Sequence, residues 1–217
     1  MKRKEFENFM RFSNDIKYDL LIPPIGLNFQ KMTPKQAKEN FDWFISKIPE
    51  RMNYFRNRCA KDLNILPEEL NYSPESLVVI WRWFLKTAKM EKTPKDELEK
   101  MKEGAKIFGE SFINREQFTV ATKFVIRDIG MYVGQVYTIN YPLLYWHYRT
   151  RPRNSINVNQ PLIAGFRAKY IGNEGDVYFQ PIHMVEVQAA NFYDKSQKET
   201  DIYNIFTKWV EYIPKQE

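Results

Sequence analysis

The sequence feature that most constrains the fold of this chain is a residue pattern shared by three predicted helix starts. A hydroxyl residue stands directly before proline at Thr33-Pro34, Ser73-Pro74 and Thr93-Pro94. The hydroxyl can accept a hydrogen bond from a helix N-terminal N–H, and proline suits the first helical position because its missing N–H is not needed there. Gln36, three residues after Thr33, completes a capping box. The sequence therefore predicts helices over about 34–48, 74–90 and 94–108.

The spacing of apolar residues extends this helical pattern. Pro49 should break or kink the first helix, with a further helical stretch over 50–63. The helix from Pro74 is apolar on most sides and should be central, whereas the helix from Pro94 is mostly Lys and Glu and should be exposed. Apolar residues recur at three- and four-residue spacing over 115–139, which indicates one long helix.

Gly130 and Gly134 lie four residues apart on one face of that long helix. Glycine allows another backbone or side chain to approach closely because it has no Cβ. We favour close packing against a neighbouring element, and the approach of a ligand is the alternative.

The second half of the chain changes from helical to strand-like patterns. Strands are predicted over 143–149, 161–166 and 177–179, with a turn at 173–176. Helices over 181–193 and 200–213 follow. The predicted fold is therefore α+β, with a helical part over about 1–139, a small antiparallel sheet over about 143–180 and a helical tail over about 181–213. We expect a single domain over 1–217 because no internal repeat or low-complexity linker is present.

Bulk composition narrows the class of protein. Aromatic residues make up 16% of the chain, so we expect much ring packing in the core. No apolar run approaches the roughly 18–20 residues that a membrane span needs. Acidic residues interrupt the basic N-terminus, which argues against a signal peptide. With a single cysteine, Cys59, an internal disulfide is excluded, and a cytoplasmic protein is the simplest expectation.

Catalytic and cofactor motifs are missing from the sequence. One cysteine and two histidines give no zinc-ligand spacing, and there is no Walker loop, dinucleotide fingerprint or nucleophile elbow. We therefore expect no cofactor and favour a protein without catalytic activity. Two alternatives stay open: Cys59 as a nucleophile with His147 or His183, against a packing cysteine, and Asp128 as a catalytic carboxylate with either histidine, against a structural ion pair.

Charge is distributed unevenly along the chain. The formal net charge is +6, yet the 45 positions between Asp128 and Glu174 hold no acidic residue. The same stretch holds eight Tyr, Trp or Phe residues and five basic ones: Arg149, Arg151, Arg153, Arg167 and Lys169. This stretch is the candidate interaction surface.

Within this stretch, residues 145–153 alternate side chains as a strand would. Tyr145, His147, Arg149 and Arg151 would share one face, with Trp146 and Tyr148 on the other. In the simplest interpretation Trp146 and Tyr148 pack on helices while the arginines are solvated. In the functional interpretation the arginine forks bind carboxylates or phosphates. The predicted partner-binding residues are Trp146, His147, Arg149, Arg151, Arg153, Asn157 and Asn159.

An acidic protein is the partner that we expect for this surface. Nucleic acid is the alternative partner. It is less favoured because the strip has few lysines, no nucleic-acid-binding signature is present, and a pI near 9.2 is only modestly basic.

Several short segments carry a resemblance to a known group. These are Asp128-Ile-Gly-Met-Tyr-Val-Gly-Gln-Val136, Trp146, Asn159-Gln-Pro-Leu-Ile-Ala-Gly-Phe166 and Gln180-Pro181. Together they resemble uncharacterised bacterial α+β proteins of the immunity or chaperone-like type that occur near polymorphic toxins, with Gln135 standing where that group has an acidic residue. The resemblance covers roughly residues 115–210 and implies a non-catalytic binding protein, and we expect a toxin-neutralising immunity protein.

Overall fold

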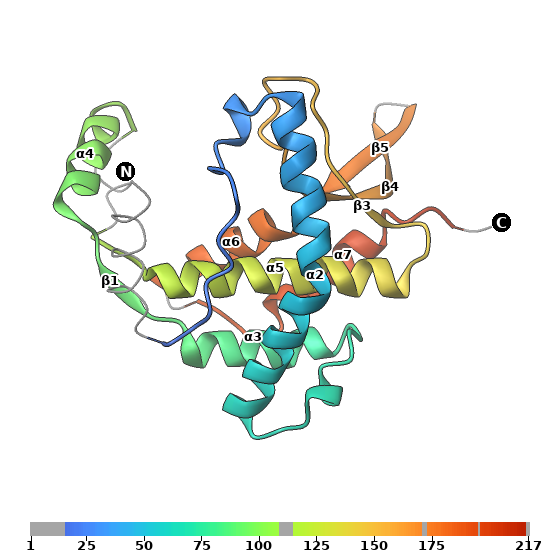
Figure 1. Ribbon diagram of the computed structural model, residues 1–217, viewed down its shortest axis with the longest axis horizontal. Coiled ribbons are helices and arrows are strands. Elements are labelled where there is room, and N and C mark those ends of the chain that lie inside the picture. The colour runs from blue at the N-terminus through green and yellow to red at the C-terminus, as the bar shows by residue number, and fades with distance from the viewer. Residues whose placement is uncertain (1–15, 109–114, 171–172, 195, 216–217) are drawn as a thin grey trace. The chain divides into compact units, whose positions relative to one another are not determined.

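The protein is described by a computed structural model over residues 16–108, 115–170, 173–194 and 196–215 (Figure 1). These residues form six α-helices and two small antiparallel sheets, of two and three strands, which confirms the predicted α+β class. Within the described ranges, two compact units are distinguished, residues 16–20 with 86–108 and 115–125, and residues 21–85 with 126–170, 173–194 and 196–215. The single domain expected from the sequence stays a prediction.

The first unit is built around a two-stranded sheet that the sequence did not predict. Strand β1 (Met90–Lys92) pairs antiparallel with β2 (Glu116–Phe118), and α4 (Lys95–Phe108) connects them. Residues 116–118 were predicted as helix, and that prediction is wrong. All the side chains that the structure describes in α4 are exposed or half-buried, as its Lys and Glu content predicted.

Threonine hydroxyls fix the junction between this sheet and the following helix. The Thr122 hydroxyl donates to the Lys89 carbonyl at 3.2 Å and accepts from the Lys89 N–H at 3.0 Å. The Thr119 N–H also donates to the Lys89 carbonyl, at 3.0 Å. The backbone beside the sheet is thus satisfied by side chains, which explains why helix α5 (Val120–Asn140) begins after Thr119 and not near Arg115.

In the second unit, α2 (Pro34–Leu63) is one continuous helix. Its capping box forms as predicted, with the Thr33 hydroxyl accepting from the Gln36 N–H at 3.2 Å and the Gln36 side chain accepting from the Thr33 N–H at 2.9 Å. Of the two predicted effects of Pro49, a break or a kink, the break does not occur, and the helical stretch predicted over 50–63 is confirmed as part of the same helix. Pro49 is exposed, while buried side chains continue on both sides of it, at Ile48 and Met52, so packing holds the helix together across the missing hydrogen bond.

The remaining helices differ from their predicted bounds at their ends. Helix α3 (Ser76–Thr87) is shorter than the predicted 74–90, because Pro74 lies in the preceding turn and Met90 belongs to β1. Helix α6 (Pro181–Ala190) is followed by a 3-10 turn, and α7 (Asp201–Val210) lies within the predicted 200–213.

The three-stranded sheet has the order β3-β4-β5 and is antiparallel throughout. Its strands are β3 (Tyr145–His147), β4 (Leu162–Tyr170) and β5 (Asn173–Phe179). Residues 173–176, predicted as a turn, instead pair with β4, for example Gly175 with Ala168. Because β3 ends at His147, the strand alternation predicted through Arg151 is wrong beyond that residue.

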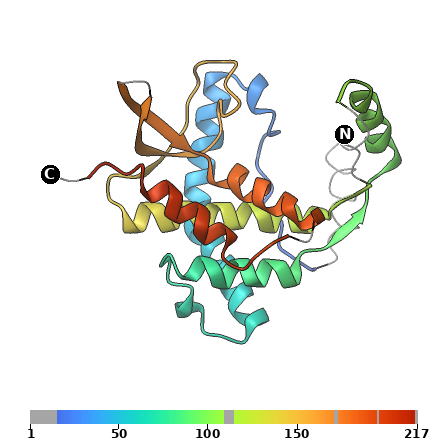
Figure 2. The same ribbon diagram turned by 180° about the vertical axis from the view of Figure 1, so that it is seen from behind.

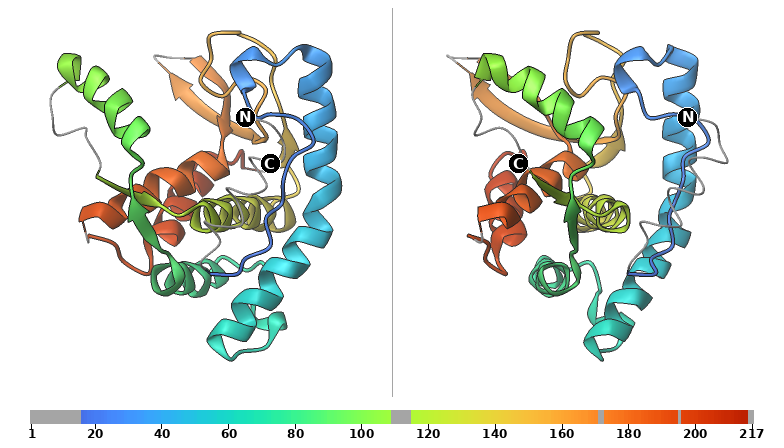
Figure 3. Two further views of the ribbon diagram at one scale, coloured as in Figure 1. Left: turned by 60° about the vertical axis from the view of Figure 1, so that its left-hand side comes forward. Right: turned by 90° about the vertical axis from the view of Figure 1, so that its left-hand side faces the viewer.

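Helix α5 lies between α2 on one side and the α6–α7 pair on the other (Figures 1, 2 and 3). The Tyr137 ring of α5 lies 5.4, 5.1 and 4.6 Å from the rings of Phe166, Phe179 and Phe206. This aromatic cluster confirms the expected ring packing and joins the sheet and α7 to the central helix. Within the described residues, no helix combines the length and the apolar character needed to cross a membrane.

The two α5 glycines mark where other elements come closest to this helix. A Cβ on Gly134 would lie 2.1 Å from Trp146 Cζ2, and one on Gly130 would lie 2.5 Å from the Ile182 Cα. The predicted close packing is therefore confirmed at both glycines. The absence of a Cβ at these two positions allows β3 and α6 to pack directly against α5.

Candidate functional site

The arginines at 149, 151 and 153 lie on a closed loop and not on a strand. The loop covers residues 149–160, between β3 and β4, and is called the arginine loop below. Its ends are joined by a hydrogen bond of 2.7 Å from the Asn159 N–H to the Arg149 carbonyl. Asn159 has a φ of 61°, in the left-handed region that asparagine tolerates better than most residues. Compact loops with close ends of this kind are frequent binding elements.

The segment that precedes α2 anchors this loop through hydrogen bonds. The Asn159 side-chain amide donates to the Phe29 carbonyl at 2.8 Å, and Gln30 Nε2 donates to the Ser155 carbonyl at 2.9 Å. Val158 is buried. Asn159 itself is only 2% exposed, so its side chain supports the loop and does not face a partner, which corrects its prediction as a contact residue.

The tip of the arginine loop is presented to solvent. Arg151 and Arg153 are exposed, and Ile156 is 70% exposed, the highest value among the large exposed hydrophobic side chains of the described residues. Tyr145, on the neighbouring strand β3, is 56% exposed. Cationic, apolar and aromatic groups are therefore all accessible on this part of the second unit.

No carboxylate of the described residues forms an ion pair with Arg149, Arg151 or Arg153. Elsewhere arginines do find such partners, as in Arg58 with Asp62 at 2.8 Å and Arg82 with Glu199 at 2.7 Å. All three arginines lie in the stretch between Asp128 and Glu174, so no acidic residue is close to them in sequence. The arginine loop thus carries positive charge that its surroundings leave uncompensated.

Arg149 and His147 both lie against Tyr178 of β5. The Arg149 guanidinium carbon lies 4.4 Å from the centre of the Tyr178 ring, and the His147 ring is stacked on the same tyrosine at 6.3 Å. Burial, followed by the positive charge of Arg149, lowers the pKa of His147, so the imidazole is mostly neutral at pH 7. Sequence reasoning missed Tyr178, because its position beside His147 depends on the pairing of β3, β4 and β5.

Trp146 and Tyr148 pack against helix α2, as the simplest interpretation of the strip predicted. Trp146 is half-buried, 5.0 Å from the ring of Phe44, and its indole N–H donates to the Gln135 side chain at 2.9 Å. Tyr148 lies 4.8 Å from the ring of Phe41. Trp146 therefore fixes the sheet on its helices, and the exposed groups around it form the accessible surface.

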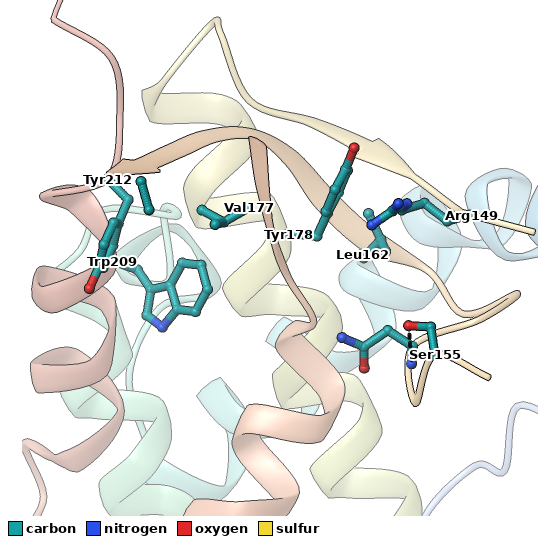
Figure 4. Close-up of a pocket in the computed structure, with 9 residues that line it drawn as sticks. Arg149, Ser155, Leu162, Val177, Tyr178, Trp209 and Tyr212 are labelled. Atoms are coloured by element: carbon teal, nitrogen blue, oxygen red, sulfur yellow. Dashed lines mark hydrogen bonds between the residues drawn. The ribbon is translucent and has the colours of Figure 1, made fainter. Parts of the chain in front are cut away.

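A surface hollow of about 360 Å³ adjoins the arginine loop (Figure 4). In Figure 4 Arg149 and Tyr178 lie beside each other at one end, while Trp209 and Tyr212 approach from the α7 end. Arg149 and Asn157 belong to the predicted set, whereas Trp209 and Tyr212 carry no sequence signal for this place. The lining residues are Arg149, Ser155, Asn157, Leu162, Ala168, Val177, Tyr178, Trp209 and Tyr212.

The groups considered for catalysis are not accessible or not assembled. Asp128 is 0% exposed and is held by Arg51, whose Nε lies 3.0 and 2.9 Å from its two oxygens, which confirms the expected structural pairing. Cys59 is also fully buried, and burial raises the pKa of its thiol, which confirms a packing cysteine. His183 is exposed on α6, 3.6 Å from Glu186. Across the described ranges, no cluster of His, Cys, Asp and Glu could hold a metal ion.

These features define an α+β protein whose candidate site is an accessible cationic and aromatic surface. Comparisons of the chain with protein-family models, with curated proteins and with solved structures gave no match. The function is therefore argued from the geometry of this surface.

Proposed function

We propose that this protein is a non-catalytic binding protein that captures an acidic protein through the arginine loop. In its most specific form, the proposal is a toxin-neutralising immunity protein acting in the bacterial cytoplasm. The observation that carries the proposal is the presence of three arginines on an anchored loop, with no carboxylate partner among the described residues.

The chemistry of the loop suits protein recognition. Guanidinium groups bind carboxylates through paired N–H donors, and arginine and tyrosine are enriched among the residues that dominate interface energies. Exposed Tyr145 and Ile156 add aromatic and apolar area beside the charges. Since the Asn159 and Gln30 hydrogen bonds already order the loop, binding costs less conformational entropy than it would for a mobile segment.

Support for the toxin-neutralising form comes from the resemblance carried by residues 128–136, 159–166 and 180–181. The resembled group is of the immunity or chaperone-like type and occurs near polymorphic toxins, and inactivation of a toxin by a bound protein needs no catalytic residue. The burial of Cys59 and Asp128 agrees with such a mode of action.

The proposal is tested by capture of partners from the native host with tagged protein. The variant Arg151→Glu/Arg153→Glu reverses two exposed charges whose side chains form no hydrogen bond or ion pair with the described residues. The control Lys61→Glu/Lys89→Glu makes the same change in net charge at two other exposed positions. We expect the wild type and the control to retain one protein rich in Asp and Glu, and the Arg151→Glu/Arg153→Glu variant to lose it.

Equal capture by all three forms would remove the arginine loop from the binding surface. Capture that disappears on nuclease treatment, together with a steep fall in oligonucleotide affinity with salt, would replace the acidic protein by nucleic acid. The toxin-neutralising form makes a further demand. Expression of the captured protein alone should arrest growth, and co-expression of the wild type but not of the charge-reversed variant should restore it.

A further inference from the structure

The hollow beside the arginine loop combines one cation with an aromatic wall. Of its nine lining residues, Arg149 alone carries a charge. Among the described residues, the Arg149 side chain forms neither a hydrogen bond nor an ion pair, and its guanidinium lies over the face of the Tyr178 ring, 4.4 Å from the ring centre. The edge of the guanidinium, where its N–H donors lie, is therefore available to an incoming carboxylate.

The remainder of the hollow is suited to an apolar ring. The buried residues Leu162 and Ala168 line it, and Trp209 and Tyr212 of the α7 end supply aromatic surface. Tyr212 is 43% exposed, so an incoming group can reach its ring. Its position is fixed by the backbone, since the Tyr212 carbonyl accepts from the Arg167 N–H of β4 at 2.8 Å.

Size and polarity limit the guest further. A volume of about 360 Å³ lies at the lower end of the range of roughly 300–1,000 Å³ found for small-ligand sites. Such a space suits a short peptide segment with one aromatic ring. Ser155 and Asn157 of the arginine loop also line the hollow and can hydrogen-bond to a peptide backbone.

We propose that this hollow receives an anchor of the acidic partner, an aromatic side chain next to an aspartate or glutamate in sequence. The ring lies against Trp209 and Tyr212, and the carboxylate meets Arg149. This inference rests on the proposed function and deepens it, because it separates a local anchor at Arg149 from the wider attraction exerted by Arg151 and Arg153.

Blocked dipeptides test the anchor without the partner protein. N-acetyl-Asp-Phe-amide is titrated at millimolar concentrations into the isotope-labelled full chain, and amide NMR shifts are followed. We expect shifts concentrated at Arg149, Asn157, Tyr178 and Tyr212. N-acetyl-Asn-Phe-amide lacks the charge and N-acetyl-Asp-Ala-amide lacks the ring, and each should bind about three- to tenfold more weakly, as for one partly exposed contact.

Two variants assign the binding to the hollow. Arg149→Gln should abolish the preference for Asp-Phe over Asn-Phe, and Tyr212→Ala should abolish the preference for Phe over Ala. Lys61→Gln is the control for loss of one positive charge, because Lys61 is exposed, lies outside the arginine loop and does not line the hollow, so it should leave all dipeptide affinities unchanged.

Absence of localised shifts, or equal shifts with all three dipeptides, would overturn the proposal. Tighter binding of free phenylacetate than of N-acetyl-Asp-Phe-amide would also overturn it, in favour of a small aromatic acid as the occupant. The two proposals fail separately. Loss of partner capture in the Arg151→Glu/Arg153→Glu variant with no dipeptide binding would retain the binding function and reject only the anchor.

Discussion

At the scale of single residues, the ion pair between Arg51 and Asp128 is the most demanding interaction of the core. Arg51 Nε lies 3.0 and 2.9 Å from the two Asp128 oxygens, and the side chains are 3% and 1% exposed. The guanidinium also lies over the Tyr54 ring at 4.6 Å. Two buried charges are tolerated because each compensates the other, so the loss of either one leaves the second uncompensated.

Asp128→Asn is therefore expected to lower the free energy of unfolding by about 3–5 kcal/mol, the usual effect of breaking a buried pair from one side. Urea denaturation followed by circular dichroism measures the change. Asp42→Asn, which removes an exposed pair with Lys38 at 2.6 Å, is the matched control and should change stability little. If both variants unfolded at the same urea concentration as the wild type, the ion pair between Arg51 and Asp128 would make no contribution to stability.

At the scale of elements, contact between α5 and β3 depends on Gly134, which has no side chain. Trp146 Cζ2 and Cη2 occupy the space 2.1 and 2.4 Å from the point where a Gly134 Cβ would stand. The Trp146 indole also donates to Gln135, one residue along the helix, at 2.9 Å. Strand β3 and the start of the arginine loop are thus seated on α5 by a single large ring. The position of the proposed binding surface depends on this contact.

Gly134→Ala is expected to destabilise the protein by about 1–3 kcal/mol, because overpacking at the indole exceeds the gain in helix propensity. Trp146→Phe shortens the ring at the atoms that would clash. The double variant should therefore lose less stability than the sum of the losses in the two single variants, by about 1 kcal/mol or more. Urea denaturation of all four proteins of the cycle measures the coupling. Strict additivity would show that the two residues do not meet.

At the scale of the whole molecule, buried tyrosines link stability to alkaline pH. Burial raises the pKa of Tyr132 to about 12, against the usual value near 10, and burial also raises the pKa of Tyr137 and of Tyr72. Since the folded state holds these protons more tightly, their stabilising contribution is complete below about pH 10. The contribution is lost as the pH rises from about 10 through 12, where only the unfolded chain is deprotonated.

The free energy of unfolding should accordingly fall above about pH 10, by roughly 1.4 kcal/mol per pH unit for each tyrosine that titrates only in the unfolded chain. Urea denaturation at several pH values in this range gives the slope. Tyr132→Phe removes one such group and should make the slope shallower, although it also removes the contact of 2.8 Å between the Tyr132 and Ser76 hydroxyls. A stability that stayed constant across this range would contradict the linkage.

Local signals in the sequence predicted much of the helical structure. The capping box of Thr33 and Gln36 placed the start of α2, and the two α5 glycines predicted close contacts that the structure confirms. A cap and a glycine act through their immediate neighbours, so a sequence pattern is sufficient to predict them. The continuity of α2 through Pro49 was not predictable in this way, because buried packing on both sides overrides the local preference of proline.

The same distinction between local and tertiary information applies to the candidate surface. The sequence by itself determined that positive charge gathers at Arg149, Arg151 and Arg153 without acidic neighbours, because charge depends only on residue type. Only the tertiary structure decided that Asn159 is buried under the loop, that Tyr178 lies beneath Arg149, and that Trp209 and Tyr212 complete a hollow. Those relations join residues far apart in the chain. They arise from strand pairing and helix packing, which no short pattern specifies.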